Sequence, residues 1–178
     1  MRTWIWLAVM VLTGGVCAIA EVADSAANGF TIKSTVNMQA VPADVYQAIL
    51  QVGDWWDPAH TFSGDAHNLS LEAKAMGCWC EKLPNGGSVR HMEVLTVMPG
   101  KSLVLAGGIG PMQSLGVAGS MKFQLTAAEG GTKLDFSYAV GGYLAAGLNT
   151  VAPIVDRVLG EQLARLKGYV ERGRAAGK

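Results

Sequence analysis

The chain has 178 residues, half of them hydrophobic, and its 14 Lys and Arg residues balance 14 Asp and Glu residues. A near-neutral chain without a basic stripe is not typical of nucleic-acid-binding proteins, so we predict no nucleic acid as a partner. The length of residues 21–178 suits a single domain with one sizeable core.

The first twenty residues have the pattern of an export signal. Arg2 gives a positive start, an apolar run follows at residues 4–12, and Ala18-Ile19-Ala20 is a small-residue cleavage site. An uncleaved N-terminal anchor is the alternative, but the apolar run is short for a membrane span of about 20 residues. We therefore predict a signal peptide at residues 1–20 and a periplasmic or secreted protein without stable membrane insertion after cleavage.

The next segments predict a leader, a strand and a helix. Residues 21–29 are small and polar, and we expect a disordered leader there. Residues 30–38 alternate apolar and polar side chains, which predicts a half-buried strand. Pro42 and Asp44 then start a helix, because proline fits the first helical position and an acidic side chain fits the positive end of the helix dipole. Gly53-Asp54 is expected to end this helix.

Residues 55–65 are expected to form a loop that carries unusually large and polar side chains. Trp55 and Trp56 are adjacent and cannot both point the same way, so one should pack on the core and the other face a cavity mouth or solvent. His60 is a candidate general acid or base, or a donor that orients a ligand. The alternative is a lid whose aromatic residues only cover the core.

Further strands separated by turn signals follow this loop. Asn85-Gly86 and Glu129-Gly130-Gly131 mark two hairpin turns. Residues 107–119 are rich in glycine and have no clear period, so we expect a loop or a broken edge strand there. The predicted strands span residues 69–73, 77–83, 88–97, 103–106, 119–127 and 132–140.

The hairpin around Asn85-Gly86 brings possible metal ligands together. Regular pairing puts Cys80 opposite His91 and Cys78 opposite Glu93, and the period of two places all four on one face of the sheet. Two thiols, an imidazole and a carboxylate are possible ligands for a divalent metal such as zinc. The other face would then hold a cross-strand pair between Glu81 and Arg90. A slip of one residue would exchange the two faces.

Three states are open for these two cysteines: free, metal-bound or disulfide-bonded. A Cys-x-Cys pair on a flat strand is a poorer metal clamp than the wider spacing found on turns. A disulfide is also unfavourable, because residues two apart on a strand have Cα atoms about 6.6 Å apart and parallel Cβ vectors. We predict free, buried thiols, no metal and no other cofactor. His91 would then satisfy a buried hydrogen bond.

Residues 153–172 have the spacing of a long amphipathic helix, and residues 173–178 are expected to be a flexible tail. Consecutive strands with helices at their ends are typical of an α+β fold. We predict a curved antiparallel sheet of about six or seven strands wrapped around this helix, with a cavity between the two. The apolar helix face comprises Val155, Val158, Leu159, Leu163, Leu166, Tyr169 and Val170.

Residues 30–170 resemble the SRPBCC family, also called START-like or polyketide cyclase/dehydrase-like. The resemblance rests on HTFSGDA at residues 60–66, GCWCE at 77–81, NGGSVRH at 85–91 and the closing helix. The sequence is similar to the bacterial branch of this family that is named after Hsp90 ATPase activators. A role as such an activator conflicts with an export signal, because that chaperone is intracellular. The family implies a helix-grip fold with an elongated cavity for hydrophobic or amphipathic molecules. Its members range from lipid and hormone carriers to cyclases, so the fold does not fix the function.

The sequence thus favours an exported binding protein, built on a domain at residues 30–172, that holds a small hydrophobic ligand. No catalytic residue is assigned. One alternative is a cyclase or dehydratase that uses His60 or His91 as acid–base. Another is a metal- or thiol-dependent protein that uses Cys78, Cys80 and His91. The residues expected near the ligand are Trp56, His60, Cys80, His91, Tyr138 and Tyr143.

Overall fold

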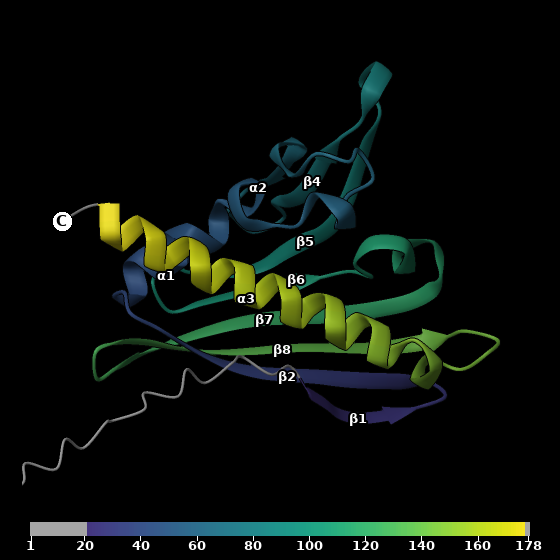
Figure 1. The fold of residues 1–178 in the computed structure, drawn as a ribbon. Coiled ribbons are helices and arrows are strands. Elements are labelled where there is room, and N and C mark those ends of the chain that lie inside the picture. Colours follow the sequence, from purple (N-terminus) through teal and green to yellow (C-terminus); the bar gives the residue numbers. More distant parts are fainter. Residues whose placement is uncertain (1–20, 177–178) are drawn as a thin grey trace, which may run out of the picture.

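A computed structural model describes residues 21–176, with side chains to residue 173. The predicted signal peptide at residues 1–20 lies outside the described residues. Eight antiparallel strands form one sheet in the order β1-β2-β8-β7-β6-β5-β4-β3, and the long helix α3 lies diagonally across one face of it (Figure 1). This is the helix-grip arrangement, so the predicted α+β fold class is confirmed.

The strands are β1 (Glu21–Ala26), β2 (Gly29–Met38), β3 (Leu69–Leu71), β4 (Cys78–Lys82), β5 (Ser88–Met98), β6 (Ser102–Ala106), β7 (Gly116–Ala128) and β8 (Gly131–Tyr143). The α-helices are α1 (Pro42–Leu50), α2 (Val52–Trp55) and α3 (Ala152–Ala176). Single-turn helices are η1 (Pro58–His60), η2 (Ala66–Asn68), η3 (Pro84–Gly86), η4 (Gly110–Ser114) and η5 (Leu148–Thr150).

Both ends of the predicted domain are more ordered than expected. Residues 21–26 are not a disordered leader, because they form β1 and pair with β2 from Glu21↔Lys33 to Ala26↔Gly29. The side chains of β1 are mostly exposed, so its pairing comes from backbone hydrogen bonds that cover the free edge of β2. Residues 173–176 belong to α3 rather than to a flexible tail.

The first helical region continues past the predicted stop. After Gln51 the chain turns into α2, which includes Gly53 and Asp54 and ends at Trp55. A Cβ atom at Gly53 would lie 3.0 Å from the carbonyl oxygen of Ala66, so glycine lets α2 pack closely against the η2 segment. Gly53 therefore serves a close approach of two backbones and does not end the helix.

The glycine-rich segment divides into two parts. Its first part contains η4, and from Gly116 onward it belongs to β7, which pairs with β8 along its whole length from Gly116↔Tyr143 to Ala128↔Gly131. The second part is therefore an interior strand of the sheet, between β6 and β8.

The core lies between α3 and the sheet. Toward the C-terminal end of α3, Leu159, Leu163, Leu166 and Val170 are buried, as their spacing predicts. Toward its N-terminal end, Val155 and Val158 are only half-buried, and Ile154 is 55% exposed. The helix face is thus fully packed over one half of the sheet and incompletely packed over the other.

In residues 21–176, none of the helices has the length and apolar character needed to cross a membrane.

Candidate functional site

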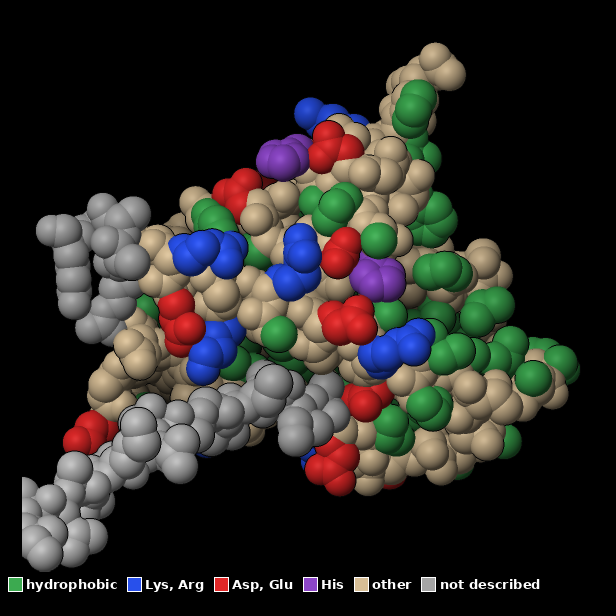
Figure 2. Space-filling view, viewed as in Figure 1, with side chains coloured by type: hydrophobic (Ala, Val, Ile, Leu, Met, Phe, Trp, Pro, Cys, Tyr) green, Lys and Arg blue, Asp and Glu red, His purple; other side chains and the backbone are tan. Residues whose placement is uncertain are grey.

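The incompletely packed half of α3 borders a cavity of about 670 Å³. The cavity is bounded by α3, by the loop at residues 55–65 and by the segment around η4, and its inner wall comes from β4 and β5. Figure 2 shows hydrophobic side chains gathered at the end of the molecule where α3 begins and η4 lies, whereas charged side chains alternate farther along α3. A volume of this size and a mainly apolar wall are typical of small-molecule sites.

Aromatic rings form the inner wall of the cavity. The rings of Trp56 and Trp79 are perpendicular, with centroids 5.0 Å apart, and the ring of His91 lies 6.3 Å from that of Trp79. Phe62, at the mouth, lies 5.8 Å from His91 and is 51% exposed. These rings come from three separate elements, so the wall forms only when the loop at residues 55–65 closes on the sheet.

The two adjacent tryptophans have different surroundings, as predicted, although their ring centroids are only 5.6 Å apart. Trp55 turns into the core, where its indole nitrogen donates to the carbonyl oxygen of Ala48 at 2.8 Å. Trp56 lines the cavity, and its indole nitrogen donates to the carbonyl oxygen of His60 at 3.1 Å. This bond fixes the η1 turn against the wall of the cavity.

A β-bulge changes the predicted register of the β4–β5 hairpin. Cys78 pairs with Glu93 as expected, but Cys80 pairs with Arg90, so His91 is an extra residue on β5. The bulge turns His91 to the inner face, where both His91 and Met92 are buried. The prediction that His91 shares a face with the two cysteines is therefore wrong.

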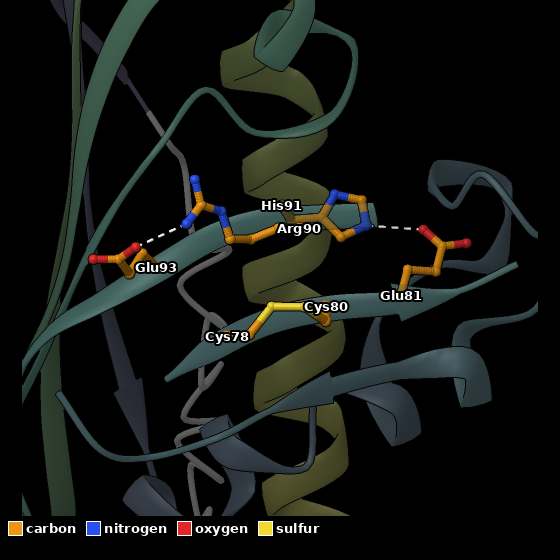
Figure 3. Close-up of a disulfide and its surroundings, with 6 residues drawn as sticks. All are labelled: Cys78, Cys80, Glu81, Arg90, His91 and Glu93. Carbon is orange, nitrogen blue, oxygen red and sulfur yellow. Dashed lines mark hydrogen bonds and ion pairs between the residues drawn. A yellow bond between two sulfur atoms is a disulfide. The ribbon is translucent and has the colours of Figure 1, made fainter. Parts of the chain in front are cut away.

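The bulge brings His91 to Glu81 rather than to Cys80. Glu81, 1% exposed, accepts a hydrogen bond from Nε2 of His91 at 2.8 Å (Figure 3). The expected pair between Glu81 and Arg90 does not form, because Arg90 lies on the outer face and binds Glu93 at 2.8 Å. Sequence reasoning put Glu81 next to Trp79 on the face opposite His91 and paired it with Arg90, so it missed Glu81 as a residue of the site.

Glu81 also holds the loop at residues 55–65. Its carboxylate accepts hydrogen bonds from the backbone nitrogens of Phe62, at 3.1 Å, and Ser63. Burial raises the pKa of Glu81, but the hydrogen bonds from Ser63, Phe62 and His91 outweigh burial and hold the pKa below its ordinary value. The carboxylate is thus ionised and needs donors, so Nε2 of His91 carries a hydrogen and Nδ1 is the ring nitrogen left for other contacts.

Cys78 and Cys80 form a disulfide on the outer face of β4, so the prediction of free, buried thiols is wrong. Their Cα atoms are 5.3 Å apart, closer than in an extended strand, because β4 is contracted at this point. Figure 3 shows the bridge beside the ion pair of Arg90 and Glu93. The four residues considered as possible metal ligands are not brought together, and the described part of the chain contains no cluster of three or more metal-ligating side chains.

The side chains of α3 fix the loop from the other side. Gln162 accepts a hydrogen bond from the backbone nitrogen of Asp57 at 2.8 Å, and Arg165 donates to the carbonyl oxygen of Trp55 at 2.9 Å. Glu161 lies 3.6 Å from Nε2 of His60. The loop is therefore clamped between Glu81 on the sheet and three polar side chains on α3.

Three of the six residues expected near a ligand line the cavity: Trp56, His60 and His91. The other three do not. Cys80 is on the outer face, Tyr143 is 74% exposed at the end of β8, and Tyr138 is fully buried in the sheet. The hydroxyl of Tyr138 donates to the carbonyl oxygen of Gly107 and accepts from the backbone nitrogen of Ile109, both at 3.0 Å.

Tyr138 therefore positions the segment that closes the cavity. Burial raises the pKa of Tyr138 to about 12, so the hydroxyl keeps its proton for this contact. The segment around η4 then contributes wall residues that sequence reasoning missed, because its glycine-rich sequence has no period. The missed wall residues are Ile109, Met112 and Leu115 from this segment, Val151 just before α3, and Val155, Arg157 and Val158 from the start of α3.

No family model matches the chain, and no curated protein matches its sequence. Solved structures match its fold. A protein from Rhizobium leguminosarum is 18% identical, with a TM-score of 0.61, over 87% of this chain and 98% of that chain. The Aha1 dimer from Colwellia psychrerythraea is 20% identical, with a TM-score of 0.55, over 79% of this chain and 96% of that one.

A third similar structure is the di-domain ARO/CYC StfQ from the steffimycin biosynthetic pathway. It is 13% identical, with a TM-score of 0.57, over 84% of this chain and 53% of StfQ. The chain has a START-like helix-grip fold. At these identities the likeness extends to the fold and to no residue of the site.

Proposed function

We propose that this protein is an exported carrier or sensor that holds a small hydrophobic or amphipathic molecule in the cavity under α3. The observation that carries the proposal is the cavity itself, with about 670 Å³ lined by mainly apolar side chains. The double clamp on the loop at residues 55–65 supports it, because a pre-formed wall lowers the entropic cost of binding.

A fluorescence titration with N-phenyl-1-naphthylamine, a neutral apolar dye, tests the proposal. Val158→Trp places an indole in the cavity and should weaken dye binding by about tenfold or more, since the added ring takes up cavity volume. Val41→Trp is the matched control, because Val41 is 56% exposed before α1 and does not line the cavity. Equal dye affinity in the two variants would contradict a binding site under α3.

An acid–base enzyme of the cyclase or dehydratase type is the second candidate, and the Glu81–His91 pair on the cavity wall favours it. Glu81 orients the imidazole, and Nδ1 of His91 would exchange a proton with a bound molecule. StfQ, described as an ARO/CYC of a biosynthetic pathway, has the same fold. His60 is a weaker choice for this role, because its partner Glu161 is half exposed.

The molecule that copurifies with the protein separates the two candidates. Native mass spectrometry gives its mass, and incubation with fresh protein shows whether it is converted. If the unchanged protein converts the molecule and His91→Asn binds it without converting it, the protein is an enzyme. If the unchanged protein leaves the molecule as it was, the protein is a carrier or sensor.

The exported location rests on residues 1–20, and fractionation tests it. Expression of the full chain should yield a periplasmic or culture-medium protein whose N-terminus is Glu21, the first residue of β1. Cytoplasmic protein that retains residues 1–20 would contradict export.

A further inference from the structure

The charged groups on the cavity wall are unbalanced in sign. The ionisable side chains that line it are His60, His91 and Arg157, and no carboxylate is among the described lining residues. Both histidines already have a carboxylate partner: His60 lies 3.6 Å from Glu161, and His91 lies 2.8 Å from Glu81. A molecule in the cavity thus meets the permanent positive charge of Arg157 and no carboxylate among the described side chains that line it.

Of the three ionisable side chains that line the cavity, Arg157 is the one without an ion-pair partner among residues 21–173. Glu161 lies one helical turn farther along α3, where an i,i+4 pair with Arg157 is possible, but it contacts His60 instead. Arg157 is exposed on the second turn of α3, at the mouth of the cavity. Its guanidinium group is therefore available to a ligand.

Two exposed apolar side chains line the cavity together with Arg157. Ile154, one turn earlier on α3, is 55% exposed, and Phe62, across the mouth, is 51% exposed. A guanidinium group at an apolar rim fits the acidic head of an amphipathic molecule, because it binds carboxylate, sulfate or phosphate through two parallel hydrogen bonds. Apolar neighbours also exclude part of the water that weakens an exposed ion pair.

We propose that the ligand of this cavity is an amphipathic acid, with its apolar body under α3 and its acidic head at Arg157. This inference rests on the proposed binding function and adds the chemical class of the ligand. Arg157 sets the charge preference, whereas the cavity wall provides the apolar contact.

Displacement of N-phenyl-1-naphthylamine by decanoate, decyl sulfate, decanol and decylamine at neutral pH tests the inference. The four compounds share one chain and differ in the head group. Decanoate or decyl sulfate should bind at least about tenfold more tightly than decylamine, and the affinity should fall with rising salt. The stronger of the two acids identifies whether the head is a carboxylate or a sulfate-like group.

Arg157→Gln should remove the preference for acids over decylamine, because it should weaken the binding of decanoate and decyl sulfate much more than that of decanol and the dye. Arg172→Gln is the matched control, because Arg172 is another exposed arginine on α3 that does not line the cavity. If the acids bind no more tightly than decylamine, or if Arg157→Gln and Arg172→Gln behave alike, the inference is overturned while the binding function stands. If the dye and all four compounds fail to bind, the proposed function itself is wrong.

Discussion

One buried carboxylate connects the two halves of the cavity wall. Glu81 has donors from the loop, Phe62 and Ser63, and a donor from β5, His91. A buried carboxylate with three donors is stable only while all of them stay in place, so the loop and the strand are held by the same group.

Replacing Glu81 by Gln should lower the free energy of unfolding by about 2 kcal/mol, because one of the three donors then meets an amide NH₂ group. Urea denaturation at neutral pH measures the change. Glu93→Gln on β5 is the control: its ion pair with Arg90 is largely exposed and should contribute at most about 0.5 kcal/mol. Equal losses in the two variants would contradict the role of Glu81.

The same substitution changes the pH dependence of stability. The pKa of Glu81 in the folded protein lies below its ordinary value of 4.5, so its ionised form stabilises the fold above that pH. The contribution is lost as the pH falls from 4.5 through the lower folded pKa. Glu81→Gln should therefore show a flatter loss of stability in acid than the unchanged protein.

At the residue level, sequence reasoning selected Trp56, His60 and His91, which line the cavity, although it put His91 on the wrong face of the hairpin. It also predicted that one of the two adjacent tryptophans packs on the core while the other faces the cavity. It failed at Cys78 and Cys80, because the argument against a disulfide assumed an extended strand and β4 is contracted there. A local contraction leaves no mark in the pattern of apolar residues.

Among the elements, the segment around η4 depends on one hydroxyl group. Tyr138 on β8 is fully buried. Its hydroxyl donates a hydrogen bond to the carbonyl oxygen of Gly107 and accepts one from the backbone nitrogen of Ile109. These two contacts lie just before the η4 residues that close the cavity.

Replacing Tyr138 by Phe keeps the ring and removes the hydroxyl. Two partly buried backbone groups then lose their partner, which should cost about 1–2 kcal/mol of stability. Hydrogen exchange at residues 107–115 should become faster than in the unchanged protein, because local opening of this segment costs less. Faster exchange spread evenly over the whole sheet would instead indicate global destabilisation and would contradict a local role for this hydroxyl.

The elements that sequence reasoning missed share one cause. β1 has mostly exposed side chains without a buried face, and the bulge at His91 adds one residue to β5. Both are fixed by backbone pairing with a neighbouring strand, β2 in one case and β4 in the other. Side-chain periodicity reports burial, so it cannot reveal pairing that depends on the backbone.

For the whole molecule, the fold followed from the order of periodic segments. Consecutive strands ended by one amphipathic helix allow few arrangements that bury the helix face. The position of the cavity did not follow from that order. It depends on Leu159, Leu163 and Leu166 packing tightly while Val155 and Val158 do not, although all five lie on the same predicted apolar face.

Ligand binding should therefore stabilise the whole domain, because the cavity joins α3 to the sheet and exists only in the folded state. N-phenyl-1-naphthylamine at ten times its dissociation constant should raise the free energy of unfolding by about 1.4 kcal/mol. Urea denaturation with and without the dye measures the rise, which at the same dye concentration should fall to about 0.4 kcal/mol or less in Val158→Trp and be preserved in Val41→Trp. If Val158→Trp is stabilised as much as the unchanged protein, the dye binds somewhere other than between α3 and the sheet.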